Sequence, residues 1–151
     1  MAKSDKVFSV NKAEDSVGFL LWQATTVWER GVKKTLEPFD LTHSQFVLLA
    51  SLLWLSSQQE NVTQIDLSVH SKIDPMTTSS VVRTLEKKKF VQRKEHSSDT
   101  RAKAITLTSN GLALARRAIK VIEKFDKEFF GALNLKLNDF KNALQTLIKE
   151  A

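Results

Sequence analysis

Two helix-start signals lie close together in the middle of this chain, and they constrain its fold more than any other feature. Thr63 is followed three residues later by Asp66, an arrangement in which each side chain can accept the other residue's backbone N–H. Asp74 stands directly before Pro75, which combines a helix cap with proline at the first helical position. We therefore expect a short helix, a turn, and a second helix that ends near Lys88, which is the pattern of a helix-turn-helix.

The segment after these helices is basic and has the length of two short strands. Residues 90–94 and 102–107 are the expected strands, and a polar connection between them predicts a β-hairpin. Residues 83–103 contain eight Lys or Arg and three Asp or Glu, a net charge of +5 out of +6 for all 151 residues. A basic surface concentrated on a helix and its neighbouring hairpin attracts a polyanionic duplex, because neutralising phosphates releases condensed counterions. The sequence therefore predicts double-stranded DNA as a partner.

The rest of the chain shows helical periodicity. Apolar residues recur at helical spacing over residues 15–37, again after Thr42, and over residues 108–130, where Thr108 or Ser109 can cap the helix. A break separates this last stretch from a final helix near the C-terminus. Four glycines and two prolines favour long helices over a turn-rich all-β chain. The expected fold class is mainly α with a small β-hairpin (α+β).

Several function classes find no support in these residues. Zero cysteines exclude disulfides, thiolate metal sites and cysteine nucleophiles. The three histidines lie on separate expected elements without metal-ligand spacing, and no glycine-rich phosphate loop or H-E-x-x-H helix occurs. No apolar run approaches the ~18 residues of a membrane span, and the N-terminus lacks the apolar core of a secretory signal. We expect a cytoplasmic protein that is not an enzyme and has no cofactor, metal or membrane partner.

Four motifs carry a resemblance to a known family. They are R-x5-D-x-R at Arg93, Asp99 and Arg101, I-T-L-T-x-x-G at 105–111, V-V-R-T-L-E at 81–86, and F-D-L-T-x-x-Q-F at 39–46. In this order, and with the expected helices around them, they resemble the MarR family of winged helix-turn-helix transcription regulators. The resemblance covers the chain from about residue 15 to its end. One departure is Lys89, because such regulators usually place glycine in the turn before the wing.

The resemblance implies a sequence-specific transcription regulator that binds double-stranded DNA. It implies a ligand-responsive repressor that acts as a homodimer on a palindromic operator, with two recognition helices one DNA turn, ~34–36 Å, apart. The single MarR-like domain would comprise a flexible arm at 1–14, dimerisation helices at 15–37 and 108–151, and the winged helix-turn-helix at 42–107. Two alternatives stay open: the terminal helices complete a monomeric core, or the winged helix is an architectural DNA-binding or protein-interaction module without an effector.

By resemblance, the helix at about 75–88 enters the major groove. Helical spacing leaves seven side chains outward or flanking. All of them except Met76 are expected DNA contacts: Thr77, Ser79, Ser80, Arg83, Thr84 and Lys87. Many relatives carry arginine at the positions that match Ser80 and Thr84. We therefore expect this chain to read its site by hydroxyl and methyl contacts and by groove shape. The alternative is that the hydroxyl side chains only satisfy the first turn of a solvated helix.

The hairpin supplies the remaining expected contacts, at Arg93, Lys94, Asp99, Arg101 and Lys103. Arg101 lies beyond the polar tip, where an extended guanidinium could enter a narrow minor groove. The resemblance implies that the Asp99 carboxylate orients the arginines of the wing, chiefly Arg101 and in addition Arg93. The alternative is an ordinary exposed ion pair that stabilises the protein by ~0–1 kcal/mol. About six phosphate contacts would give log affinity a slope of about −5 against log salt. The side chains expected to make them are Lys87, Lys88, Lys89, Arg93, Lys94 and Lys103.

Members of this family are commonly released from DNA by small aromatic or phenolic ligands. The candidates for such an effector pocket are Trp22, Trp28, His43 and Phe46, apolar or amphipathic side chains on the first two helices. The alternative for each of them is a plain core residue. Because the chain has no cysteine, the thiol-oxidation sensing that some relatives use is excluded.

Overall fold

Helices dominate the part of the chain that this computed structural model describes, residues 7–99 and 101–149. The helices are α1 (Val17–Leu36), α2 (His43–Ser56), α3 (Gln64–Ser71), α4 (Pro75–Lys87), α5 (Ser109–Gly131) and α6 (Leu137–Lys149). The strands are β1 (Val91–Glu95) and β2 (Lys103–Leu107), and short 3-10 turns are η1 (Ala13–Asp15), η2 (Glu37–Phe39) and η3 (Asn134–Lys136). The expected mainly α fold with a hairpin is confirmed. Residues 1–6 of the expected arm lie outside the described residues.

Local capping explains where the helices of the helix-turn-helix begin. The Thr63 hydroxyl accepts the Asp66 backbone N–H at 3.2 Å, and the Asp66 carboxylate accepts the Thr63 N–H at 2.9 Å. The Asp74 carboxylate accepts the Thr77 N–H at 2.8 Å, and Pro75 stands at the first helical position. These contacts satisfy N–H groups that have no partner inside the helix. Both predicted helix starts are confirmed.

The hairpin is short and antiparallel, and it is attached to the helical body at both ends. Val91 pairs with Leu107 at its base and Glu95 with Lys103 near its tip. Just before β1, Lys89 has a positive φ of 65°, a conformation that glycine adopts more readily than other residues. Lys89 thus adopts a left-handed conformation although it is not glycine.

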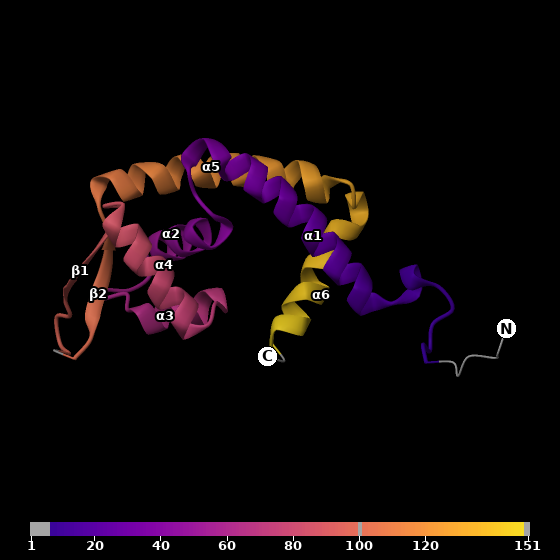
Figure 1. The fold of residues 1–151 in the computed structure, drawn as a ribbon, viewed down its shortest axis with the longest axis horizontal. Helices are drawn as coiled ribbons and strands as arrows, with labels where there is room; N and C mark the ends of the chain where they lie inside the picture. The colour runs from indigo at the N-terminus through magenta and orange to yellow at the C-terminus, as the bar shows by residue number, and fades with distance from the viewer. Residues whose placement is uncertain (1–6, 100, 150–151) are drawn as a thin grey trace.

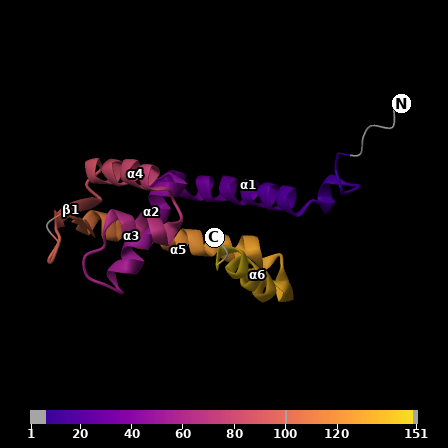
Figure 2. The ribbon, with the colours of Figure 1, turned by 90° about the horizontal axis from the view of Figure 1, so that it is seen from below.

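The core lies under the winged helix-turn-helix rather than along the whole chain. Buried apolar side chains from α2, α3, α4, β1 and β2 meet those of the C-terminal end of α1 and the first half of α5. In Figure 1 this unit forms one end of the molecule, while α6 and the N-terminal part of α1 lie at the other end. The view from below in Figure 2 shows the same elongated arrangement, with α1 and α5 running along it.

The far end of the molecule leaves large apolar side chains uncovered. On α1 only Val32 and Leu36 are buried, and α6 has no buried residue. Exposed apolar side chains on these two helices are Val17, Phe19, Leu20, Leu21, Trp22, Val27, Leu137, Leu147 and Ile148. Apolar faces that stay open in this way mark a surface for interaction. None of the helices within residues 7–99 and 101–149 is long and apolar enough to cross a membrane.

Candidate nucleic-acid interface

Helix α4 turns one face to the core and the opposite face to solvent. Thr78, Val82 and Leu85 are buried, and Val81 is half-buried beside them. The opposite face carries four exposed side chains at intervals of four, three and four residues, and these are Met76, Ser80, Arg83 and Lys87. This spacing aligns them in one stripe along the helix, which we call the α4 stripe. The sequence prediction included three of the four; Met76, 84% exposed, was not among the expected contacts although its outward position was evident.

The three threonine hydroxyls of α4 have partners within the protein. The Thr77 hydroxyl donates to the Asp74 carboxylate at 2.7 Å, and the Thr84 hydroxyl donates to the Ser80 carbonyl at 3.2 Å. The hydrogen bond from the Thr77 hydroxyl, followed by that from its backbone N–H, lowers the pKa of Asp74, so this carboxylate stays ionised and keeps the first turn of α4 in place. Ser79 is half-buried. Among the expected contacts, Ser80 is therefore the exposed residue whose hydroxyl makes no hydrogen bond with the described residues.

The wing tip is held by side chains that accept backbone N–H groups. The Asp99 carboxylate accepts the Arg101 N–H at 2.9 Å, and the His96 Nδ1 accepts the N–H groups of Ser98 at 3.1 Å and Asp99 at 3.0 Å. Asp99 thus braces the backbone of Arg101 and leaves the guanidinium exposed. His96 had been considered only as a metal ligand, and its role in the tip was missed by sequence reasoning.

Arg93 departs from its expected role as a second arginine oriented by Asp99. Its Nε lies 3.8 Å from a Glu86 carboxylate oxygen, and its Nη2 donates to the Gln64 side-chain oxygen at 3.4 Å. These partners lie on α4 and at the start of α3, so Arg93 joins the hairpin to the helix-turn-helix. The expectation that Asp99 orients the Arg93 side chain is wrong for this geometry.

A second attachment of the wing comes from the loop between α2 and α3. The Asn61 side-chain oxygen accepts the Ser97 backbone N–H at 3.1 Å, and its amide nitrogen contacts the Ser97 hydroxyl. Asn61 has φ 53°, a conformation that asparagine tolerates better than most residues. The neighbouring Val62 carbonyl accepts the Ile105 N–H at 2.7 Å. The sequence showed only a polar loop here, because the partner is 36 residues away.

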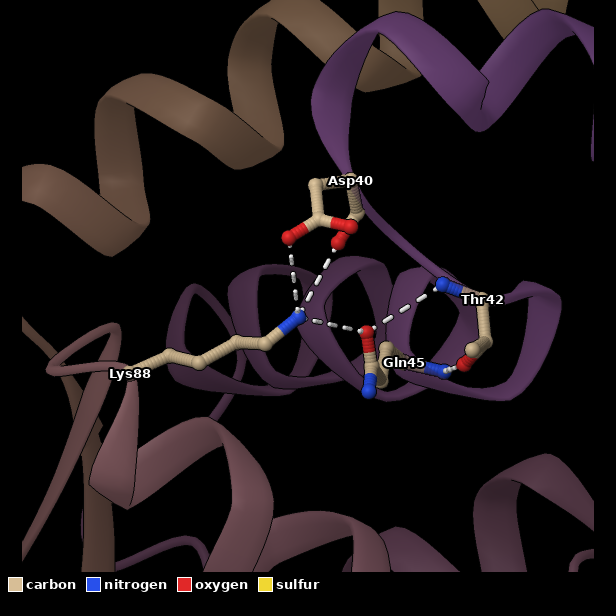
Figure 3. A network of polar contacts seen from close by, with 4 residues as sticks. All are labelled: Asp40, Thr42, Gln45 and Lys88. Carbon is tan, nitrogen blue, oxygen red and sulfur yellow. Dashed lines mark hydrogen bonds and ion pairs between the residues drawn. The ribbon is translucent and has the colours of Figure 1, made fainter.

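Two lysines of the basic segment pair with oxygen atoms of the protein itself. The Lys88 ammonium turns toward the corner between α1 and α2, where it meets oxygens of Asp40 and Gln45 (Figure 3). Lys103 pairs with Glu95, its partner in the hairpin register. The expectation that Lys88 contacts phosphate does not fit this arrangement. Lys87, Lys89 and Lys94 are exposed.

The four expected effector residues do not line one cavity. The rings of Trp28 and His43 meet edge-on with centroids 5.1 Å apart, and the Trp28 indole N–H donates to the Asp126 carboxylate at 2.9 Å. His43 lines a cavity of about 480 Å³, whereas Phe46 and Asp126 line a separate one of about 540 Å³. Trp22 lies apart on α1 and is 70% exposed. Burial lowers the pKa of His43, and the carboxylates of Glu29 and Asp126 oppose that shift.

The described residues hold no group of three His, Asp or Glu side chains that could bind a metal ion. What the site offers is a helix with an exposed polar and basic stripe, next to a hairpin whose tip is anchored and carries an exposed arginine. Such surfaces contact phosphates and base edges of a duplex rather than transform a substrate.

Known proteins with this sequence pattern and this fold are regulators of transcription. The family model described as the MarR family matches residues 41–103. The chain is 46% identical over 134 residues to the HTH-type transcriptional regulator YdcH of Bacillus subtilis, covering 89% of this chain and 90% of that protein. It is 32% identical over 137 residues to the HTH-type transcriptional repressor Rv2887 of Mycobacterium tuberculosis, covering 89% and 96% respectively.

Solved structures give the same picture. The S. aureus MepR–DNA complex matches with a TM-score of 0.79 and 25% identity, over 92% of this chain and 98% of that chain. The complex of Rv2887 with p-aminosalicylic acid matches with a TM-score of 0.66 and 31% identity, over 87% and 98% respectively.

Proposed function

The chain belongs to the MarR family of winged helix-turn-helix transcription regulators, and from this membership we propose how it binds DNA and responds to a ligand. It is a DNA-binding regulator, and we assign it the role of a repressor that binds its operator in the cytoplasm. The proposal assigns regulation rather than catalysis, because the relatives that the chain matches are transcriptional regulators.

The observation that carries the proposal is the α4 stripe together with the anchored wing. The stripe would enter the major groove, where Arg83 can form a fork with guanine and Met76 can contact a thymine methyl group. Ser80 and Lys87 would contact base edges and phosphates between and beside them. Thr77, Ser79 and Thr84 flank the stripe and would contact the sugar-phosphate backbone of the DNA.

The wing would place the Arg101 guanidinium in the adjacent minor groove. Its backbone is fixed by Asp99, so the side chain extends from a defined position and loses less conformational freedom on binding. A narrow minor groove has an enhanced negative potential and favours such an arginine. Lys94 would contact phosphate, and Lys103 would do so less strongly because it already pairs with Glu95.

We further propose a homodimer formed by α1, α5 and α6. The apolar side chains exposed on α1 and α6 would be covered by the second copy, which would also set the spacing of the two α4 helices on a palindromic site. A small aromatic effector is a further part of this proposal. It is supported by the solved complex of Rv2887 with p-aminosalicylic acid and by the Trp28–His43 ring pair between α1 and α2.

The test begins with selection of bound fragments from a random duplex pool, which yields the operator. The protein should prefer that site over random duplex by ~10³-fold or more at equal salt. Equal affinity for all duplexes would indicate an architectural module instead. Arg101→Ala should then weaken operator binding about 10- to 100-fold in fluorescence anisotropy, since a groove contact of this kind is worth ~1–3 kcal/mol.

The matched control for the wing arginine is Lys103→Ala, whose ammonium already has a carboxylate partner. It should lower operator affinity by only a few-fold, and both variants should keep the parent's dimerisation and melting temperature. Unchanged affinity in Arg101→Ala would exclude the minor-groove role.

A further inference from the structure

One lysine of the basic segment makes contacts that none of its neighbours makes. Lys88 follows the last residue of α4, and its Nζ donates to the Asp40 backbone carbonyl at 3.0 Å and to the Gln45 side-chain oxygen at 3.4 Å. The same nitrogen lies 3.8 Å from the Asp40 carboxylate (Figure 3). An ammonium has three donors, and here three oxygens of one short segment surround it. We call this set of contacts the Lys88 tie.

Both acceptors are themselves fixed by the corner between α1 and α2. Asp40 adopts φ 51° at the end of η2, and its backbone N–H donates to the Glu37 carbonyl at 3.0 Å. Gln45 is a buried residue in the first turn of α2, and its side-chain oxygen also accepts the Thr42 backbone N–H at 3.2 Å. The two hydrogen bonds of the tie therefore end on the turn and the capping structure that begin α2, whereas the Asp40 carboxylate is fully exposed and adds only a solvent-screened ion pair.

Burial separates Lys88 from the lysines on either side of it. Its side chain is 31% exposed, whereas Lys87 and Lys89 are exposed. To reach a phosphate, Lys88 would have to give up its contacts and leave the Gln45 oxygen with one partner fewer. Charge-assisted hydrogen bonds are among the stronger ones, so this rearrangement is disfavoured.

We infer that Lys88 is a positioning residue that ties the C-terminal end of the recognition helix to the α1–α2 corner. This inference rests on the proposed function. The corner, residues 37–42, joins the α1 dimerisation helix to the winged unit, so it is the place where the two could pivot relative to each other. A dimer that reads two half-sites needs a fixed distance between its α4 helices, and the tie restrains that pivot.

The tie also forms part of the wall of the cavity of about 480 Å³ that His43 lines. Lys88, Asp40 and Gln45 all face this cavity, so a small molecule bound there would contact the tie directly. The position of the recognition helix and the occupancy of the cavity are thereby physically connected.

The test compares Lys88→Met with Lys87→Met, two neighbouring lysines replaced by the same neutral side chain. Lys88→Met should lower operator affinity about tenfold, while its affinity for random duplex and its salt slope stay at the parent's values. Lys87→Met should lower affinity for both duplexes together and reduce the salt slope by about 0.9 for each protomer. If Lys88→Met reduces the slope as Lys87→Met does, Lys88 is a phosphate contact and the inference is overturned.

A distance measurement tests the tie without DNA. The chain has no cysteine, so Lys34→Cys on α1 and Ser80→Cys on α4 can carry spin labels, with excess unlabelled chain isolating distances within one protomer. Lys88→Met should shift or broaden the distance distribution and Lys87→Met should not; identical distributions for both would also overturn the inference. Failure of the parent to select an operator would reject the proposed function but leave this distance result interpretable. Circular dichroism and melting of each variant ensure that only folded protein is compared.

Discussion

Gly111 gives the sharpest stability prediction, because the backbone of another segment occupies the space of a side chain there. A Cβ at this position would lie 1.9 Å from the Phe90 carbonyl oxygen and 2.8 Å from its carbonyl carbon. An ordinary carbon–oxygen contact is about 3.3 Å or longer, so Gly111→Ala must push the two segments apart by more than 1 Å. The Phe90 carbonyl also accepts the Thr108 N–H at 3.0 Å, a bond that this shift would break.

The expected change in the free energy of unfolding follows from two destabilising contributions and one stabilising contribution. Overpacking of this kind costs about 1–3 kcal/mol, and the lost hydrogen bond costs about 0.5–1.5 kcal/mol. Alanine in place of glycine near a helix start gains back at most about 1 kcal/mol. We expect Gly111→Ala to lower the free energy of unfolding by about 2 kcal/mol and to loosen the junction between the hairpin and α5.

Urea unfolding at one fixed protein concentration measures this change, since dimerisation makes stability depend on concentration. Gly18→Ala on α1 is the matched control, because a Cβ there meets nothing within 4 Å. It should stabilise the protein by up to about 1 kcal/mol through helix propensity alone. If Gly111→Ala is as stable as the parent to within about 0.5 kcal/mol, the close approach to Phe90 does not constrain this position.

Two further predictions concern backbone conformation and pH. Lys89→Gly should raise the free energy of unfolding by about 0.5–1 kcal/mol, because the relief of a left-handed conformation outweighs the added freedom of the unfolded chain; an unchanged urea midpoint would contradict it. Burial lowers the pKa of His43, and the opposing charges of Glu29 and Asp126 only partly offset this shift. The neutral imidazole therefore contributes to the free energy of unfolding above pH 6.5, the usual pKa of histidine, and this contribution is lost as the pH falls through the lower pKa of the folded state. Urea unfolding from about pH 7.5 to 5 should therefore show a smaller loss of stability in His43→Gln than in the parent, with His70→Gln as the exposed control; equal losses in His43→Gln and the parent would argue against it.

The starts of the helices could be predicted from the sequence because capping is local. Thr42, Thr63, Asp74 and Thr108 each accept the backbone N–H three residues ahead. Such a contact needs only the right residue at the right spacing, and tertiary packing does not have to be known. The same reasoning predicted the inward face of α4, whose period follows from helix geometry alone.

The turns between elements were less predictable, because tertiary closure sets their conformation. Asp40, Asn61, Lys72 and Lys89 all have positive φ, and none of them is glycine. Asp40 and Asn61 tolerate this conformation, but lysine carries no turn signal at Lys72 or Lys89, and at Lys89 the family resemblance led us to expect glycine. What fixes these residues is the packing of the helices and hairpin on either side, which compensates for a modest local strain.

The basic segment shows most clearly where sequence reasoning ends. In the sequence each of its eight cations is an equal candidate for DNA contact. In the structure Lys88, Arg93 and Lys103 instead pair with oxygen atoms of the protein. The other five of these eight cations make no side-chain hydrogen bond or ion pair with the described residues, and they are Arg83, Lys87, Lys89, Lys94 and Arg101. If all five displace counterions, the lysines at phosphates and the two arginines in the grooves, the salt slope would be about −4.5 for each protomer, close to the −5 expected from six.

The salt slope expected from the sequence and the one expected from the structure are similar, but different residues produce them. The partners of Lys88 lie 48 and 43 residues away, so no local pattern could distinguish it from Lys87. The charge of a segment therefore limits how many phosphates it can contact, while the fold decides which of its cations remain available. For this chain that distinction separates a residue that binds DNA from one that positions the helix that binds it.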